Sequence, residues 1–558
     1  MGTRASQLRC PPLRPVRQYF DGLVPALAMT PSRLLVIGLD GFEISLAEAM
    51  MAAGELPHLQ ALAANGAVFD IDHGRARATG LAWEQVATGR APDEGGRWSA
   101  VRFDPQTYTV CQEPTRSAPI FAALDARMVV FDPPYFDLSR TSARGVTNWG
   151  AHDPGVAAHG KPLGLDRELL HRFGPYAAKP WIYGFTWPSQ DRTLEAGRAL
   201  AEAVRQRSRA ARWLLHERLP DWDLALVTIS ESHSAIEQFW HGVDPDHPLH
   251  GLPSGAPAGR AMREIYREID RLCGDLQRMA PDAGMMVFAM HGMGANQADV
   301  AAMALLPELM YRLAFGQPHA ATPVWPNHLD NGIPLLEPDQ SWHQAMNTLV
   351  PAQPVSGSFS RLARLRRRIQ GRLGRSRSDA HRPDALEWMP AARYQPFWEH
   401  MPAFAFPAFY DGQIRLNLAG RERSGRVPIA QFEAVRDGVV DALHRTRCAI
   451  TGLPVVEEIW FPRSDPLLRS DFEPDLFIQW NETPLGFDHP TAGRIGPYPF
   501  RRTGGHTGER GFAYIDWPGI APRRGRRSAF DIVPTIFHLL GQAYPPGHSG
   551  QAITQSRP

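Results

Sequence analysis

Six side chains that can bind a metal ion or attack phosphorus stand at or near the ends of apolar, strand-like runs. They are Asp40, Thr79, His233, Glu237, His291 and His506. Carboxylates and imidazoles are common ligands of Zn²⁺, and a metal-bound hydroxyl can become a nucleophile near neutral pH. In parallel α/β sheets, functional groups collect beyond the carboxyl ends of the strands. The set predicts a metal-dependent hydrolytic site.

Asp40 and Thr79 each have a structural alternative. Asp40 follows the run LLVIGL and precedes Gly41, so it can bind a divalent ion or cap the next helix. Thr79 opens the segment TGLAWEQVATG, where a hydroxyl is either a helix cap or a nucleophile. The helix dipole and free backbone N–H groups would stabilise its alkoxide. We expect Asp40 to be a metal ligand, and Thr79 to be both nucleophile and ligand.

The remaining three segments supply imidazoles and one more carboxylate. His233 and Glu237 are four residues apart just after a strand-like run, so both lie on one helical face, as ligands or as an ordinary surface pair. His291 follows a buried run in HGMG, whose glycines permit a tight turn. His506 stands in the glycine-rich GGHTGERG, as a ligand or as a plain loop histidine.

The elements that position these residues indicate a doubly wound, mostly parallel α/β sheet sandwiched by helices. The run LLVIGL is continuously apolar, as in a strand buried on both faces, and a helical stretch and a second strand follow it. The expected strands are 34–39, 66–71, 223–230, 284–290, 475–480 and 511–517, and the expected helices include 44–66, 199–219, 257–279 and 528–541.

The pattern changes between residues 300 and 455, where Pro, Gly and Asn become frequent and periodicity is weak. We expect a catalytic core at 31–300 and 456–558, an inserted α+β cap at 301–455, and a disordered lead-in at 1–30. The stretch Arg361–Arg382 carries nine arginines and one acidic residue, Asp379. It is either a solvated insert or a contact for an anionic membrane surface or polyanion.

Bulk composition narrows the class. The net charge of +1 over 558 residues gives no reason to expect specific nucleic-acid binding, and 43% hydrophobic and 21% charged residues are ordinary for a globular protein. The four cysteines form no CxxC pair, so a disulfide framework is not expected. No run of 18 apolar residues and no convincing signal peptide occur, which favours a cytoplasmic location. The oligomeric state is left open.

Several stretches together carry a family resemblance. They are VIGLDG, T-x-x-A-W-x-x-x-x-T-G-R-x-P over 79–92, SES-x5-QFWHGVDPDHP, HGMG, IRLNLAGRE, and RTGGH-x4-GF followed by DIVPTIFHLLG. The chain resembles the type I phosphodiesterase/nucleotide pyrophosphatase branch of the alkaline phosphatase superfamily. The resemblance implies an alkaline phosphatase-like fold with two metal ions, usually zinc. It also implies that Thr79 attacks phosphorus in line and forms a phosphothreonine intermediate.

The chain departs from the family pattern at two places. An Asp-x3-His pair is replaced by His233 and Glu237, which with His506 still offers one carboxylate and two imidazoles. An Asp-His pair is replaced by Met290 and His291, and a thioether is a poor ligand for zinc. The second ion would then have only Asp40, His291 and Thr79, unless His152 or Asp153 substitutes. We expect one Zn²⁺ and a weak or absent second ion, with Mn²⁺ and Mg²⁺ as alternatives.

The leading functional prediction is a metal-dependent phosphodiesterase or related phosphoryl hydrolase. Its substrate would be a small nucleotide-like phosphodiester or a lipid- or glycan-linked one, with Trp83, Asn148 and Trp149 as candidate binding residues. One alternative is a transferase that passes a phosphoryl or substituted phosphoryl group to an alcohol on the same fold. Another is a catalytically weak binding protein, which Met290 favours. The choice between monoester and diester is left open.

Overall fold

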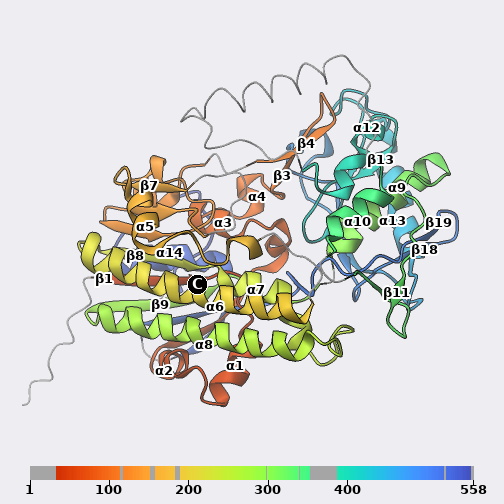
Figure 1. Ribbon diagram of the computed structural model, residues 1–558. Helices are drawn as coiled ribbons and strands as arrows, with labels where there is room; N and C mark the ends of the chain where they lie inside the picture. The colour runs from red at the N-terminus through yellow and green to blue at the C-terminus, as the bar shows by residue number, and fades with distance from the viewer. Residues whose placement is uncertain are drawn as a thin grey trace, which may run out of the picture.

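A nine-stranded sheet forms the centre of the computed structural model (Figure 1), in the order β22-β2-β21-β9-β1-β8-β5-β6-β7. The structure describes residues 33–113, 117–150, 158–182, 189–296, 298–337, 340–351, 386–518, 520 and 523–553. The strands of this sheet are Arg33–Leu39 (β1), Ala67–Asp72 (β2), Met128–Phe131 (β5), Arg144–Thr147 (β6), His159–Lys161 (β7), Leu224–Ile229 (β8), Ala283–Ala289 (β9), Arg510–Asp516 (β21) and Arg524–Ser528 (β22).

Strand directions explain why distant segments meet at one edge of this sheet. The neighbours β9, β1, β8, β5 and β6 run parallel, with Val36 of β1 opposite both Leu226 and Met286. Strand β21 is antiparallel to both β9 and β2. The carboxyl ends of β1, β2, β8 and β9 therefore share an edge with the amino end of β21. The expected mostly parallel α/β fold is confirmed.

Helices cover both faces of the sheet, because the side chains of each strand alternate between two apolar clusters. Leu35, Ile37 and Leu39 of β1 pack toward α1, α2, α6, α7 and α8, whereas Leu34 and Val36 pack toward α3 and α14. The helices are Ile44–Ala52 (α1), Pro57–Asn65 (α2), Ala82–Thr88 (α3), Pro92–Gly95 (α4), Leu165–Phe173 (α5), Gln190–Arg212 (α6), Glu231–Phe239 (α7), Gly255–Met279 (α8) and Ile532–Leu539 (α14).

A second, smaller α+β unit lies beside the main sheet, to the right in Figure 1. Its four-stranded antiparallel sheet has the order β13-β14-β17-β16, formed by Ala403–Ala405, Gly412–Leu416, Leu476–Trp480 and Val456–Trp460. Its helices are Leu306–Phe315 (α9), Trp342–Leu349 (α10), Gln395–Trp398 (α12) and Phe432–Arg445 (α13).

Five pairs of short strands lie outside the two larger sheets. A hairpin, Val101–Asp104 (β3) with Thr109–Gln112 (β4), packs on the second unit. The others join Gly294–Ala295 (β10) to Gly504–Gly505 (β20), Asn327–His328 (β11) to Pro334–Leu335 (β12), and Phe487–His489 (β18) to both Arg447–Cys448 (β15) and Gly493–Ile495 (β19).

The second unit is not limited to residues 301–455. Strand β17 pairs with β14 and β16 pairs with β17, although both fall in the stretch 456–558 expected to join the core. Phe103 of the β3–β4 hairpin belongs to the same apolar cluster. An apolar run such as DLFIQW predicts a strand but not the sheet that it joins.

Two sequence-based expectations concern parts outside the described residues. These are the lead-in at 1–30 and the segment Arg361–Arg382. Of the helices that the structure does describe, none has both the length and the apolar character needed to cross a bilayer.

Candidate active site

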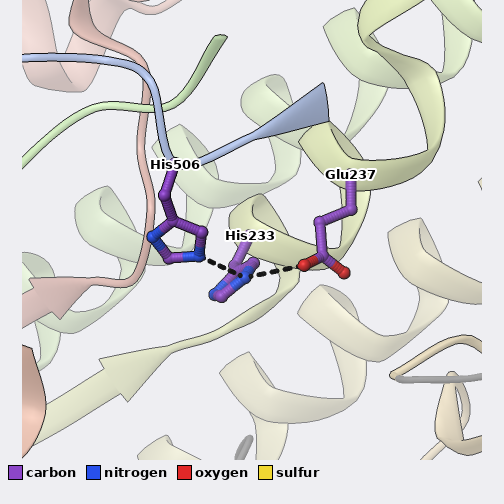
Figure 2. A group of neighbouring side chains, drawn as sticks. All are labelled: His233, Glu237 and His506. Carbon is purple, nitrogen blue, oxygen red and sulfur yellow. Dashed lines mark hydrogen bonds and ion pairs between the residues drawn. The ribbon is translucent and has the colours of Figure 1, made fainter. Parts of the chain in front are cut away.

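Three side chains from two segments converge at the shared edge of the sheet (Figure 2). His233 and Glu237 lie one turn apart in α7, which begins directly after β8, and His506 comes from the loop between β20 and β21. His233 Nε2 lies 3.1 Å from Glu237 Oε1 and 3.1 Å from His506 Nε2. One ligand atom from each residue lies within 4.8 Å of the others, and no other such group occurs among the described residues.

This donor set fits a zinc ion, because two imidazole nitrogens and one carboxylate are a common set of three protein ligands for zinc. His233 Nδ1 lies 3.0 Å from Asp40 Oδ2, so this carboxylate orients the ring and leaves Nε2 facing the other two ligands. Carboxylates hydrogen-bonded to a ligating imidazole are usual at zinc sites. His233, Glu237 and His506 would hold the ion, which would supply positive charge and Lewis acidity next to the substrate.

Asp40 follows β1 and is buried, as expected. The next residue, Gly41, has φ +60°, and a Cβ added there would lie 2.3 Å from Met293 Sδ. The turn therefore requires glycine, and it places the Asp40 carboxylate against the His233 imidazole. Asp40, which was expected to bind an ion, thus lies in hydrogen-bond contact with His233, another expected ligand.

His291 lies at the same edge, but its neighbour Met290 packs into the apolar cluster that also holds Trp83 and Phe288. His291 Nδ1 donates to the Gly292 carbonyl at 2.8 Å, and its ring centroid is 5.2 Å from that of His506. Burial is the main cause that lowers the pKa of His291 below its usual 6.5. The group of three does not include Asp40 or His291. His152 and Asp153 lie outside the described residues.

Thr79 lies at the end of a short 3-10 helix, Gly74–Thr79, just before α3. Its Oγ1 donates to the Ala76 carbonyl at 2.7 Å. It accepts hydrogen bonds from Leu81 N at 3.1 Å and from Gln85 Nε2 at 3.0 Å. The side chain is buried, and the cavity described below is lined by the next residue, Gly80, but not by Thr79 itself. Thr79 thus ends the 3-10 helix two residues before Leu81, the N-cap of α3, with its hydroxyl fixed by three hydrogen bonds.

A cavity of about 300 Å³ lies between the sheet edge and the second unit. The candidate ligands Asp40, His233, Glu237, His291 and His506 form one part of its wall. Aromatic side chains form much of the rest: Trp83, Tyr135, Trp388, Phe409 and Tyr410. Of the candidate substrate-binding residues, Trp83 lines the cavity, whereas Asn148 and Trp149 are not part of its wall. The shape and lining suit a small ligand with an apolar portion.

Two buried arginines complete the wall, and sequence reasoning missed them. Arg502 contacts the Glu237 carboxylate through Nη1, and its Nε lies 3.0 Å from Asp299 Oδ2. Arg501 also contacts Asp299, and its guanidinium lies 5.7 Å from the ring centre of Trp388. With Asp40, these three carboxylates and two guanidinium groups carry a net charge of −1. Arg501 and Arg502 directly precede the glycine-rich loop that carries His506. This position next to a candidate ligand is the sequence feature that could have identified them.

Comparisons with known proteins place the chain in a family. Residues 34–347 match the family model described as type I phosphodiesterase/nucleotide pyrophosphatase. No curated protein sequence gives a significant match.

Solved structures with a related arrangement share little sequence with this chain. The phosphonoacetate hydrolase from Sinorhizobium meliloti 1021 has 15% identity and a TM-score of 0.47, over 92% of this chain and 96% of that one. Alkaline phosphatase PafA has 12% identity and a TM-score of 0.48, over 94% and 98%. Murine ectonucleotide pyrophosphatase/phosphodiesterase 5 has 11% identity and a TM-score of 0.42, over 93% and 97%. Because the family match covers more than half of the sequence, the chain belongs to the type I phosphodiesterase/nucleotide pyrophosphatase family of phosphoric ester hydrolases.

Proposed function

We propose that this protein is a phosphodiesterase that works with one divalent ion, zinc, and with Thr79 as its nucleophile. The observation that carries the proposal is the convergence of His233, Glu237 and His506 on one wall of an otherwise aromatic cavity. Family membership supports the reaction class. Met290, which packs among apolar side chains where the family pattern has a carboxylate, supports one ion over two.

The charge balance of the site supports metal dependence. The five charged groups Asp40, Glu237, Asp299, Arg501 and Arg502 sum to −1, which would repel a phosphodiester anion. One divalent ion reverses the sign of that sum. Arg502, which already contacts Glu237, would then lie close to a bound phosphoryl group and add positive charge to it.

In the proposed reaction, Thr79 Oγ1 attacks phosphorus and the first alcohol leaves. A substituted phosphothreonine forms, in which the phosphoryl group still carries the second alcohol, and water then hydrolyses it to release a phosphomonoester. The position of Thr79 before α3 supports this role, because the free N–H groups of a helix N-terminus stabilise an oxyanion and bind phosphoryl oxygens. We infer that the Gly80 turn and the Trp83 side chain, which both line the cavity, bring the substrate to this hydroxyl.

The lining of the cavity favours a small phosphodiester with an aromatic or apolar substituent. Tyr135, Trp388 and Phe409 offer flat apolar surfaces, and the volume of about 300 Å³ accommodates a compact group. A lipid- or glycan-linked phosphodiester would have to extend beyond the cavity.

Hydrolysis of bis(4-nitrophenyl) phosphate tests the proposal. We expect turnover that EDTA abolishes and Zn²⁺ restores. Thr79→Ala should remove at least 99% of it, and Thr79→Ser should retain a measurable part, because serine keeps the hydroxyl. Full activity of Thr79→Ala, or of the metal-free protein, would refute the proposal.

A catalytically weak binding protein is the second candidate, because Met290 takes the place of an expected metal-binding carboxylate. Such a protein would bind zinc and a phosphodiester without turning it over. Isothermal titration of the zinc-loaded protein with a non-hydrolysable phosphonate diester, run beside the hydrolysis assay, separates the two functions.

A further inference from the structure

The hydrogen bonds of Thr79 fix where its proton lies. A threonine hydroxyl has one hydrogen to donate, and the Ala76 carbonyl, 2.7 Å away, can only accept it. The other two contacts of Thr79 Oγ1 must therefore come from donors. These are the Leu81 N–H at 3.1 Å and the Gln85 side-chain amide at 3.0 Å. Gln85 accordingly presents its NH₂ group, and not its carbonyl, to Thr79.

His73 locks this orientation of the Gln85 amide. Gln85 Oε1 lies 2.6 Å from His73 Nε2, so Nε2 carries the hydrogen that the carbonyl accepts. His73 is 2% exposed, and burial, together with the nearby His291, lowers its pKa to about 3, which keeps the ring neutral. The other neutral tautomer would carry its hydrogen on Nδ1, which is buried and has no hydrogen-bond partner among the described residues, so the hydrogen belongs on Nε2. A reversed amide would then place its NH₂ group against this N–H. The His73 ring also stacks on His291, with centroids 5.5 Å apart and planes at 8°.

We propose that the Leu81 N–H and the Gln85 amide form a donor pair that stabilises the Thr79 alkoxide, and that His73 positions Gln85. This inference rests on the proposed function, in which Thr79 is the nucleophile. Because Met290 stands where the family pattern has a carboxylate ligand, a second ion is not expected to stabilise the alkoxide. The donor pair would supply that stabilisation from residues of the chain itself. Gln85 touches the reacting oxygen and is a catalytic residue, whereas His73 acts through it.

The donor pair has a defined place in the chemical step. Thr79 loses its proton to hydroxide from solvent, and its hydrogen bond to Ala76 is broken. Both N–H donors still point at the oxygen and share its negative charge, as in an oxyanion hole. The oxygen then forms a bond to phosphorus, and the departing alcohol oxygen leaves with the electron pair of the bond that breaks.

The arrangement exceeds what a local turn requires. A threonine hydroxyl that closes such a turn needs one backbone donor two residues further on, and Leu81 supplies it. The Gln85 side chain adds a second donor, and His73 holds that side chain in one orientation. All three polar side chains are buried, with Thr79 3% exposed and Gln85 5% exposed.

The test measures the kcat and KM of the zinc-loaded full-length protein with bis(4-nitrophenyl) phosphate. Peptide mass spectrometry of acid-quenched samples also measures the rate at which Thr79 is phosphorylated, that is, acquires a 4-nitrophenyl phosphate group. Gln85→Met keeps the length but removes the donor, and we expect it to lower kcat and the Thr79 phosphorylation rate about 100-fold with KM within threefold. Gln85→Glu, which replaces the donor with an acceptor, should do the same if Gln85→Met folds poorly. The control is Gln206→Met, which removes a buried glutamine bonded to the carbonyls of Phe173 and Pro175 and should leave kcat unchanged.

His73 is tested by rescue. His73→Leu removes the donor to Gln85 and should lower kcat about 10-fold, whereas His73→Gln, whose amide can donate in its place, should recover most of it. If wild-type Thr79 never carries a 4-nitrophenyl phosphate group, both the proposed nucleophile and this inference fail. If wild-type Thr79 acquires this group and Gln85→Met acquires it at the same rate, this inference alone fails. Equal kcat values for His73→Leu and His73→Gln would show that His73 does not position Gln85.

Discussion

The phenol ring of Tyr410 lies against the imidazole of His506, with ring centroids 3.8 Å apart and planes at 47°. Tyr410 precedes β14 of the second unit, whereas His506 precedes β21 of the main sheet. A Cβ added at Gly80, whose φ is +67°, would lie 2.3 Å from the Tyr410 ring. Tyr410 thus fills the space between His506 and the turn that follows Thr79, and the second unit closes over the site.

Tyr410 should hold His506 in place by its ring. Tyr410→Ala leaves a gap beside the imidazole, and we expect zinc affinity and kcat/KM to fall about 10-fold each, the size typical for loss of a residue that supports a metal ligand. Tyr410→Phe keeps the ring and should stay within twofold of wild type. Zinc competition with a chromophoric chelator measures the affinity. Wild-type affinity in Tyr410→Ala would contradict this role.

Removal of any of the three candidate ligands should remove the ion. We expect His233→Ala, Glu237→Ala and His506→Ala each to reduce bound zinc from about one per chain to less than 0.2, because two remaining ligands bind zinc weakly. Plasma mass spectrometry after dialysis gives the ratio. His216→Ala, at an exposed histidine, is the control and should keep the full complement. Retention of zinc in all three variants would place the ion elsewhere.

Met290 should behave as a core residue and not as a ligand. It is 5% exposed and packs in the cluster of Trp83 and Phe288. Met290→Leu nearly conserves volume, so we expect it to cost less than about 1.5 kcal/mol of unfolding free energy and to leave zinc content and kcat unchanged. Urea unfolding, metal analysis and the hydrolysis assay check this. Loss of the ion in Met290→Leu would show that the thioether sulfur takes part in binding it.

Buried histidines away from the site should make the protein less stable in mild acid. His241 is fully buried with Nε2 at 3.0 Å from Ser254 Oγ, and burial, with the nearby His247, lowers its pKa to about 3. In the unfolded chain this histidine has a pKa of about 6.5, so between pH 3 and pH 6.5 the unfolded chain binds a proton that the folded protein does not. The free energy of unfolding therefore falls as the pH drops below about 6.5. This histidine should account for about 2 kcal/mol lost between pH 7 and pH 5.

Urea unfolding of the EDTA-treated protein at both pH values measures that loss. His241→Gln should be less stable at pH 7 but lose about 2 kcal/mol less than wild type on acidification, since the variant lacks the titrating group. An identical pH dependence in the two proteins would rule out His241 as a source of the acid sensitivity.

Much of the fold could be predicted from the sequence, because the central strands are continuously apolar. The runs ending at Leu39, Ile229 and Ala289 became β1, β8 and β9, and the parallel order of these strands brought Asp40, His233 and His291 to one edge. The four-residue spacing of His233 and Glu237 likewise predicted one helical face. Both the strands and the helical face depend on residues close together in the sequence, which is why they could be predicted.

The contacts that shape the site could not be predicted in the same way. The bond between Asp40 and His233 joins residues 193 positions apart, and the contact of Arg502 with Glu237 crosses from the loop before β21 to α7. Which sheet the run 476–480 joins also depends on tertiary packing. The hydrogen bonds of Gln85 to Thr79 and His73 stayed hidden, because a glutamine within a short helix has no distinctive pattern.

Anomalous diffraction from a zinc-soaked crystal can show whether His233, Glu237 and His506 together hold a single ion. We expect one strong anomalous peak within about 2.3 Å of His233 Nε2, His506 Nε2 and a Glu237 oxygen. A second peak of similar height between Asp40 and His291, or the absence of a peak at the three side chains, would rule out a single ion at this position.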